Sequence, residues 1–99
     1  MSKYDLHPTQ VEGEYLLDVQ TDLLDVQSTR MMVPVLPETA VPNAVRSLHP
    51  AFDMDGKMFV MATHLMGAVP RAALRPPIRN FAEHGDQITR ALDFLFQGY

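Results

Sequence analysis

The sequence predicts a mostly β domain with a single C-terminal α-helix, an α+β fold. Three observations lead to this expectation: short apolar segments separated by turn formers and prolines, an Asp-Gly pair between two apolar runs, and helical spacing of apolar residues in the last segment alone. Ninety-nine residues make one domain, residues 1–99, with a modest core. A core of this size favours sharing apolar surface with a second copy.

Two strands are expected in the first half of the chain, at residues 15–20 (YLLDVQ) and 30–36 (RMMVPVL). Pro34 has no amide hydrogen to donate to a ladder, so we expect it on an edge strand or at a bulge. Residues 37–50 form a connection punctuated by prolines, with at most one helical turn at 43–47.

A β-hairpin is predicted in FDMDGKMFVMA, because Asp55-Gly56 between apolar runs favours a two-residue type I′ turn. Val69-Pro70 then begins a short extended piece, and Pro76-Pro77 excludes a helix at that point.

The last segment predicts the helix, with one apolar face made of Ile88, Ala91, Leu92, Leu95 and Phe96. Asn80 and Glu83 have the spacing of a capping box at its start. Gly98 is well placed just past its end.

Composition excludes several classes of protein. There is no cysteine, so disulfides, thiolate chemistry and cysteine metal sites are excluded. The start MSKYDLHP lacks the apolar region of a signal peptide, and no segment is long enough to span a bilayer, so we expect a cytoplasmic protein without membrane contact. Eight basic against 12 acidic residues give a net charge of -4, which disfavours direct binding of nucleic acid.

No constellation of residues predicts catalysis, a metal or a cofactor. The four histidines lack the i, i+4 spacing that places two imidazoles on one helical face, and His7 and His49 beside prolines are expected in exposed loops. Asp18, Asp22 and Asp25 are candidates for a carboxylate cluster, but we expect Asp18 to point off a strand and the others to lie in a solvated turn. No glycine-rich phosphate loop is present.

Two features of the sequence indicate apolar residues on the surface of the protein. Leu23-Leu24 lies in the acidic, turn-like stretch TDLLDVQST, where polar residues are the rule, so at least one of these leucines is expected to be exposed. The chain ends in DFLFQGY, although chain termini are usually polar. Together these features predict an apolar surface patch.

Three segments, YLLDVQTDLLDVQSTRMMVPVL, FVMATHLMGAVP and DQITRALDFLFQGY, resemble in order and spacing the CcdB family, the toxins of CcdA/CcdB toxin–antitoxin pairs. The resemblance covers residues 15–99. It implies a compact twisted antiparallel sheet in an SH3-like barrel shared with MazF toxins, and a homodimer. It further implies a non-enzymatic poison that binds the GyrA protein of DNA gyrase and traps the DNA-cleaved complex. A CcdA-like antitoxin neutralises such toxins through a disordered tail and forms an autorepressing complex with them, so DNA is contacted only through the antitoxin complex.

The resemblance also implies two sets of binding residues. By position, the gyrase surface falls on Leu23, Leu24, Asp93, Phe96, Gln97, Gly98 and Tyr99. Antitoxin contacts are expected in the polar loop 7–14 and the edge near 41–47, at His7, Gln10, Glu12, Glu14, Val41, Asn43 and Arg46.

The family usually ends in Trp-Gly-Ile, whereas this chain ends in Gln97-Gly98-Tyr99. The resemblance implies that the terminal tryptophans of the dimer sandwich a GyrA arginine, a contact that glutamine cannot supply. A weakened toxin that acts through antitoxin binding and autoregulation is therefore one alternative. The other is a MazF-like endoribonuclease, for which Arg30 beside Ser28 and Thr29 is the only nuclease-like group, and the negative charge argues against it.

Overall fold

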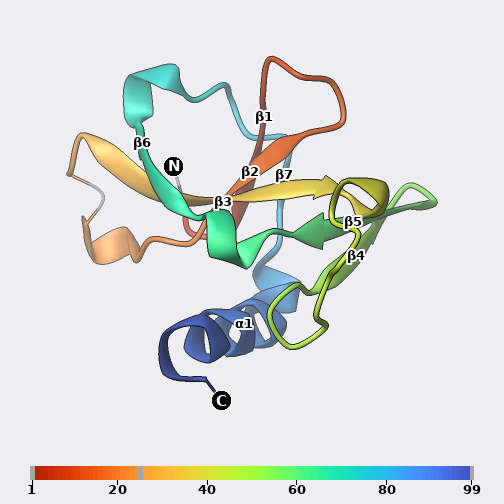
Figure 1. Ribbon diagram of the computed structural model, residues 1–99. Coiled ribbons are helices and arrows are strands. Elements are labelled where there is room, and N and C mark those ends of the chain that lie inside the picture. Colours follow the sequence, from red (N-terminus) through yellow and green to blue (C-terminus); the bar gives the residue numbers. More distant parts are fainter. Residues whose placement is uncertain (1, 25, 99) are drawn as a thin grey trace.

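The computed structural model describes residues 2–24 and 26–98, and within them one seven-stranded antiparallel sheet carries a C-terminal helix (Figure 1). The strands run in the order β4-β5-β3-β2-β1-β7, and β6 also pairs with β3. Their bounds are β1 Asp5–Pro8, β2 Tyr15–Asp18, β3 Thr29–Pro37, β4 Ala51–Met54, β5 Lys57–Met61, β6 Gly67–Pro70 and β7 Arg79–Asn80. The helix α1 spans Gly85–Gln97. The predicted α+β class is confirmed.

Single-turn 3₁₀ helices join several of these strands. They are η1 Asp22–Leu24, η2 Glu38–Ala40, η3 Thr63–Leu65, η4 Arg71–Ala73 and η5 Ala82–His84. The first of them, η1, lies between β2 and β3 and becomes part of the interaction surface described below.

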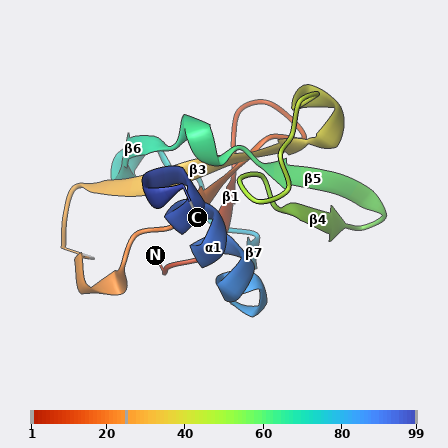
Figure 2. The same cartoon turned by 60° about the horizontal axis from the view of Figure 1, so that its bottom comes forward.

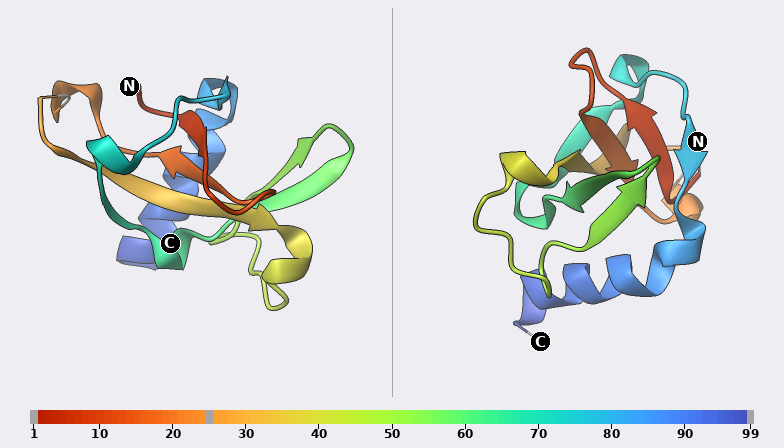
Figure 3. Two further views of the ribbon diagram at one scale, coloured as in Figure 1. Left: turned by 90° about the horizontal axis from the view of Figure 1, so that it is seen from above. Right: turned by 90° about the vertical axis from the view of Figure 1, so that its right-hand side faces the viewer.

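The long strand β3 organises the sheet. One side pairs with β2, while the other pairs with β6 through Thr29–Met32 and with β5 through Val35–Pro37. This change of partner curls the sheet into a half-barrel, seen from above in Figure 3. The expected strand at 30–36 is confirmed, but β3 is central rather than an edge strand.

Pro34 is tolerated in this central strand because of where it falls. Its carbonyl accepts a hydrogen bond from the Ala62 amide at 2.8 Å, on the side where β3 changes partner from β6 to β5. The N and C=O of a residue in an antiparallel strand point to the same side of the strand. The proline nitrogen therefore also faces the point where β3 changes partner from β6 to β5. No ladder hydrogen bond is therefore lost.

The predicted hairpin is confirmed between β4 and β5. Asp55 has φ +55° and Gly56 has φ +87°, the two positive values that define a type I′ turn. The Gly56 amide also donates to the Asp53 carboxylate at 2.9 Å, which fixes the turn further.

The core lies between the concave face of the sheet and α1, which runs along one side of the strands (Figures 1 and 3). Ile88 and Ala91 of the helix are buried, and the sheet contributes Leu6, Leu17, Val33, Val35, Phe52, Phe59 and Met61. None of the helices formed by residues 2–24 and 26–98 is long and apolar enough to cross a membrane.

The helix ends as the sequence predicted and begins differently. Gly98 is left-handed at φ +79°, and its amide donates to the Phe94 carbonyl at 2.9 Å. Asn80, however, belongs to β7 and is not the helix cap. Its side-chain oxygen accepts from the Ala82 amide at 2.8 Å, so it fixes η5, and α1 follows from Gly85.

The strand β1 was not predicted. It contains His7, which was expected in an exposed loop. His7 is buried rather than exposed in a loop, and its Nδ1 donates to the Arg75 carbonyl at 2.7 Å. The segment after η4 covers this strand, a long-range contact that the local motif His-Pro does not reveal. The expected polar loop is therefore shorter, beginning after Pro8.

Candidate interaction surface

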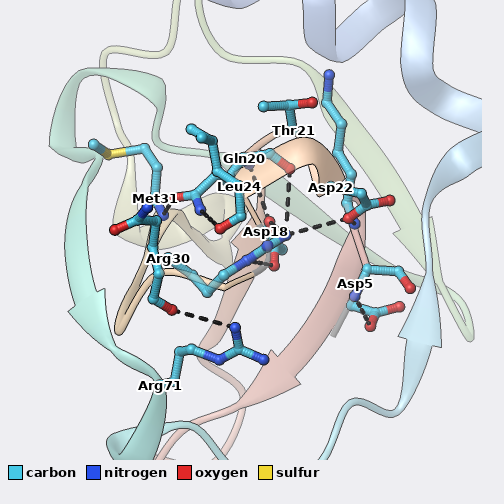
Figure 4. Close-up of polar contacts among 12 residues, drawn as sticks. Asp5, Asp18, Gln20, Thr21, Asp22, Leu24, Arg30, Met31 and Arg71 are labelled. Carbon is cyan, nitrogen blue, oxygen red and sulfur yellow. Dashed lines mark hydrogen bonds and ion pairs between the residues drawn. The ribbon is translucent and has the colours of Figure 1, made fainter.

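A buried ion pair joins β2 to β3 at the base of the loop that carries the leucine pair. Arg30 Nε donates to Asp18 Oδ2 at 2.7 Å, and Nη2 donates to Oδ1 at 2.8 Å (Figure 4). Both side chains are fully buried. Donation of these hydrogen bonds to Asp18 raises the pKa of Arg30 above its ordinary value. Asp18 projects from the end of β2, as expected, but it is buried and paired. The sequence pattern did not indicate this pairing, because the partner lies twelve residues away.

The same guanidinium holds the start of the loop. Arg30 Nη2 also contacts the Gln20 carbonyl at 3.3 Å and Asp22 Oδ1 at 3.4 Å. The Lys3 amide donates to the same Asp22 oxygen at 2.8 Å, which ties the N-terminal segment to the loop.

Gln20 completes the network and binds the far side of the loop (Figure 4). Its side-chain oxygen accepts from the Met31 amide at 3.0 Å, and its side-chain nitrogen donates to the Leu24 carbonyl at 3.2 Å. The backbone of η1 is thus fixed to β3 through one glutamine.

Above this polar base the loop presents apolar side chains to solvent. Leu23 is 91% exposed, Leu24 is 47% exposed and Val26 is 90% exposed. Exposure of the leucine pair is confirmed. Val26, which was not among the residues predicted from the sequence, extends the patch, and Asp25 lies outside the described residues. We call Leu23, Leu24 and Val26 the loop patch.

The other half of the predicted gyrase surface is the end of α1. Phe96 is 70% exposed, although helical spacing placed it on the core face, whereas Leu92 packs against the core. Asp93, Gln97 and Gly98 are exposed, and Tyr99 lies outside the described residues. Within the described residues, the connection between β2 and β3, which carries the loop patch, and the end of α1 lie apart in Figures 1 and 2.

Four of the predicted antitoxin residues line three different hollows. Glu12 borders a groove of about 920 Å³ whose apolar wall includes Tyr15 and Phe59. Val41 and Asn43 border a hollow of about 420 Å³. Arg46 borders a third hollow of about 480 Å³ beside α1. Gln10 is exposed, Glu14 is half-buried and His7 is buried.

His49 was also expected in an exposed loop, but it is buried. The Val45 amide donates to His49 Nδ1 at 2.9 Å, so the proton of the neutral ring is on Nε2, which lies 2.8 Å from His64 Nδ1. Burial, with a smaller effect of His64, lowers the pKa of His49. The pair closes one side of the 420 Å³ hollow.

The geometry offers no catalytic arrangement around Arg30. Its side chain is buried against Asp18, while the neighbouring Ser28 and Thr29 are exposed. Among residues 2–24 and 26–98, no group of three or more histidines and carboxylates could hold a metal ion. What the arrangement provides is an exposed group of apolar side chains, the loop patch, next to the buried Arg30–Asp18 pair.

A comparison with protein families agrees with this geometry. The family model described as CcdB protein matches residues 3–98, nearly the whole chain. The chain belongs to the CcdB family, the toxins of toxin–antitoxin systems.

Proposed function

We propose that this protein is a gyrase poison: as a homodimer it binds the GyrA protein of DNA gyrase and traps the complex in which DNA is cleaved. Family membership supports a toxin of this type. The observation that carries the proposal is the loop patch, whose apolar side chains face solvent on a backbone held by the buried Arg30–Asp18 pair.

A patch built in this way is suited to binding. Burying one leucine or valine side chain against a partner contributes about 1.5–3 kcal/mol. Hydrogen bonds from Gln20 and Arg30 hold the backbone at Leu24 and Gln20, which reduces the conformational entropy that this part of the chain would lose on association. A dimer would present the patch twice to the two arms of GyrA, which raises the effective affinity.

Neutralisation by a CcdA-type antitoxin is the second part of the proposal. We place its tail on the loop 9–14 and on the edge at 41–47, where Gln10, Asn43 and Arg46 are exposed. His7 would become available only if β1 opened, so it is a poor contact in this conformation. A tail that orders on binding gives modest affinity per unit area and allows rapid release by proteolysis. The toxin–antitoxin complex would also regulate the operon, contacting DNA only through the antitoxin.

The end of α1 favours a second candidate, a weakened toxin that acts mainly through its antitoxin. Gln97 is exposed at the last position of the helix, where the family usually has tryptophan. Glutamine cannot stack on an arginine of GyrA as tryptophan can. An endoribonuclease has less support, because Arg30 is buried and paired to Asp18.

Expression of the chain in a bacterial host, followed by assays with purified components, separates these functions. A gyrase poison arrests growth and accumulates cleaved DNA in a purified gyrase reaction. A weakened toxin binds a CcdA-type antitoxin without either effect. Cleavage of RNA by the pure protein, without effect on gyrase, would contradict the proposal. The matched control for the gyrase assay is Val11→Ser, which replaces an exposed apolar residue outside the loop patch and should keep the full effect on gyrase. It is not a control for antitoxin binding, because Val11 lies in the loop 9–14.

A further inference from the structure

Two arginines differ from the other four. In the part of the chain that the structure describes, Arg30, Arg71, Arg75 and Arg79 each donate to a carboxylate or carbonyl oxygen. No such partner lies against Arg46 or Arg90 within the same residues, and both line the 480 Å³ hollow. The two unpaired guanidinium groups of these residues therefore share one site.

Two separate elements bring these arginines together. Arg46 lies in a turn closed by hydrogen bonds from the Leu48 and His49 amides to the Val45 carbonyl, at 2.9 and 2.6 Å. Arg90 lies on α1, two residues after the buried Ile88. The connection between β3 and β4 runs beside α1 in Figures 1 and 3, and this places both arginines at the rim of the same hollow.

The hollow has the chemistry of a carboxylate site with an apolar neighbour. Arg46 and Arg90 bring two positive charges and Asp93 one negative charge, which leaves one net positive charge to balance a single anion. Phe94 and Pro50 supply an apolar wall. Guanidinium groups bind carboxylates through charge-assisted hydrogen bonds.

We propose that this hollow binds the side chain of a glutamate or aspartate in a peptide segment of a partner, with the adjacent apolar residue packed on Phe94. A protein ligand is favoured over nucleic acid because the chain carries a net charge of -4, which repels a polyanion, and because Phe94 and Pro50 form part of the wall. Arg46 also lies on the edge where we place the antitoxin tail, and Asp93 belongs to the predicted gyrase surface. The test below uses neither gyrase nor an antitoxin, so its outcome is distinguishable from failure of the function proposed above.

The test is an NMR titration of the full chain with the peptide acetyl-Ala-Leu-Glu-Phe-Ala-amide and with its glutamine twin. The Nε–H resonances of Arg46 and Arg90 should shift saturably with the glutamate peptide and much less with the twin. Arg46→Gln and Arg90→Gln should each weaken binding by roughly fivefold, the effect of losing one exposed charge pair. Arg90→Lys, which keeps the charge, should weaken it less.

Lys57→Gln is the control, because it removes the same charge from an exposed residue that does not line this hollow. Backbone spectra of each variant establish that it is folded. Equal binding of the two peptides would overturn the proposal, as would equal weakening by Lys57→Gln. If oligothymidylate shifted the same resonances at lower concentration than the glutamate peptide, the hollow would be a phosphate site and the proposal would be wrong.

Discussion

Arg30 and Asp18 form a two-point ion pair, fully buried, directly beneath a loop whose apolar side chains face solvent. The pair joins the ends of β2 and β3 and also reaches the backbone of Gln20. Its position means that a contact hidden from any partner determines the shape of the surface that a partner would meet.

Asp18→Asn should destabilise the fold strongly. Asparagine preserves the shape of the side chain but removes the buried partner of Arg30. Only the half-exposed Asp22, at 3.4 Å, remains as a counter-charge. Removing one partner of a buried ion pair costs about 3–5 kcal/mol. Urea unfolding followed by circular dichroism measures the loss.

The matched control is Asp55→Asn, which breaks the exposed Arg79–Asp55 ion pair at 2.7 Å. Asparagine is well tolerated at the first position of a type I′ turn, and exposed pairs contribute less than about 1 kcal/mol. Equal destabilisation by the two substitutions would show that burial of the Arg30–Asp18 pair is energetically unimportant.

Features set by local sequence were predicted correctly. Asp55-Gly56 specified its turn because only a few residues adopt two successive positive φ values. Gly98 ended the helix because glycine adopts the left-handed conformation without a steric cost. The leucine pair was recognised as exposed because apolar residues in a turn have no adjacent element on which to pack.

Features set by distant residues were missed. Asp18 is neutralised by Arg30 across the β2–β3 connection, and His7 is held by a carbonyl sixty-eight residues away, so neither environment can be read from the neighbouring sequence. Val26 could have been found, because it lies in the same polar stretch as the leucines.

Stability should fall as the pH is lowered through the histidine range. The pKa of His49 is lowered in the folded protein from its ordinary value of 6.5 by burial and by His64. The unfolded chain therefore binds a proton at a higher pH than the folded protein, so stability present above that value is lost below it. Urea unfolding at about pH 7.5 and about pH 5.5, on either side of the ordinary value, measures the loss.

His49→Phe isolates the contribution of this residue. Phenylalanine leaves the Val45 amide unpaired and lowers stability at every pH, but it removes the titration. The decrease between the two pH values should therefore be smaller in the variant. An equal decrease in both proteins would assign the pH dependence to other groups.

A homodimer is predicted in which the ends of two α1 helices approach the symmetry axis. The domain is small, and Phe96 at the helix end leaves apolar surface in water. Light scattering should give twice the mass of the chain at tens of micromolar, and a monomer at that concentration would contradict the prediction.

Gln97→Trp should strengthen the toxin without changing its stability. Gln97 is exposed beyond the residues that hold α1 to the core, so its replacement should change the free energy of unfolding by less than about 0.5 kcal/mol. Two added stacking contacts at about 0.5–2 kcal/mol each would tighten GyrA binding by about one to three powers of ten. Calorimetry with a GyrA fragment and a thermal melt measure the two quantities. Unchanged affinity would indicate that this position does not face GyrA.

We propose that the loop patch binds GyrA, and the decisive experiment measures binding of a GyrA fragment to the Leu23→Ser/Leu24→Ser double variant. Both leucines are exposed, so the variant should fold with an unchanged melting temperature. Its affinity for GyrA should fall by about a hundredfold, the effect of losing about 3 kcal/mol of apolar burial. Val11→Ser, at a residue that is 54% exposed in the β1–β2 loop, should bind as the unaltered protein does. Full affinity in the double variant, or an equal loss with Val11→Ser, would contradict the claim.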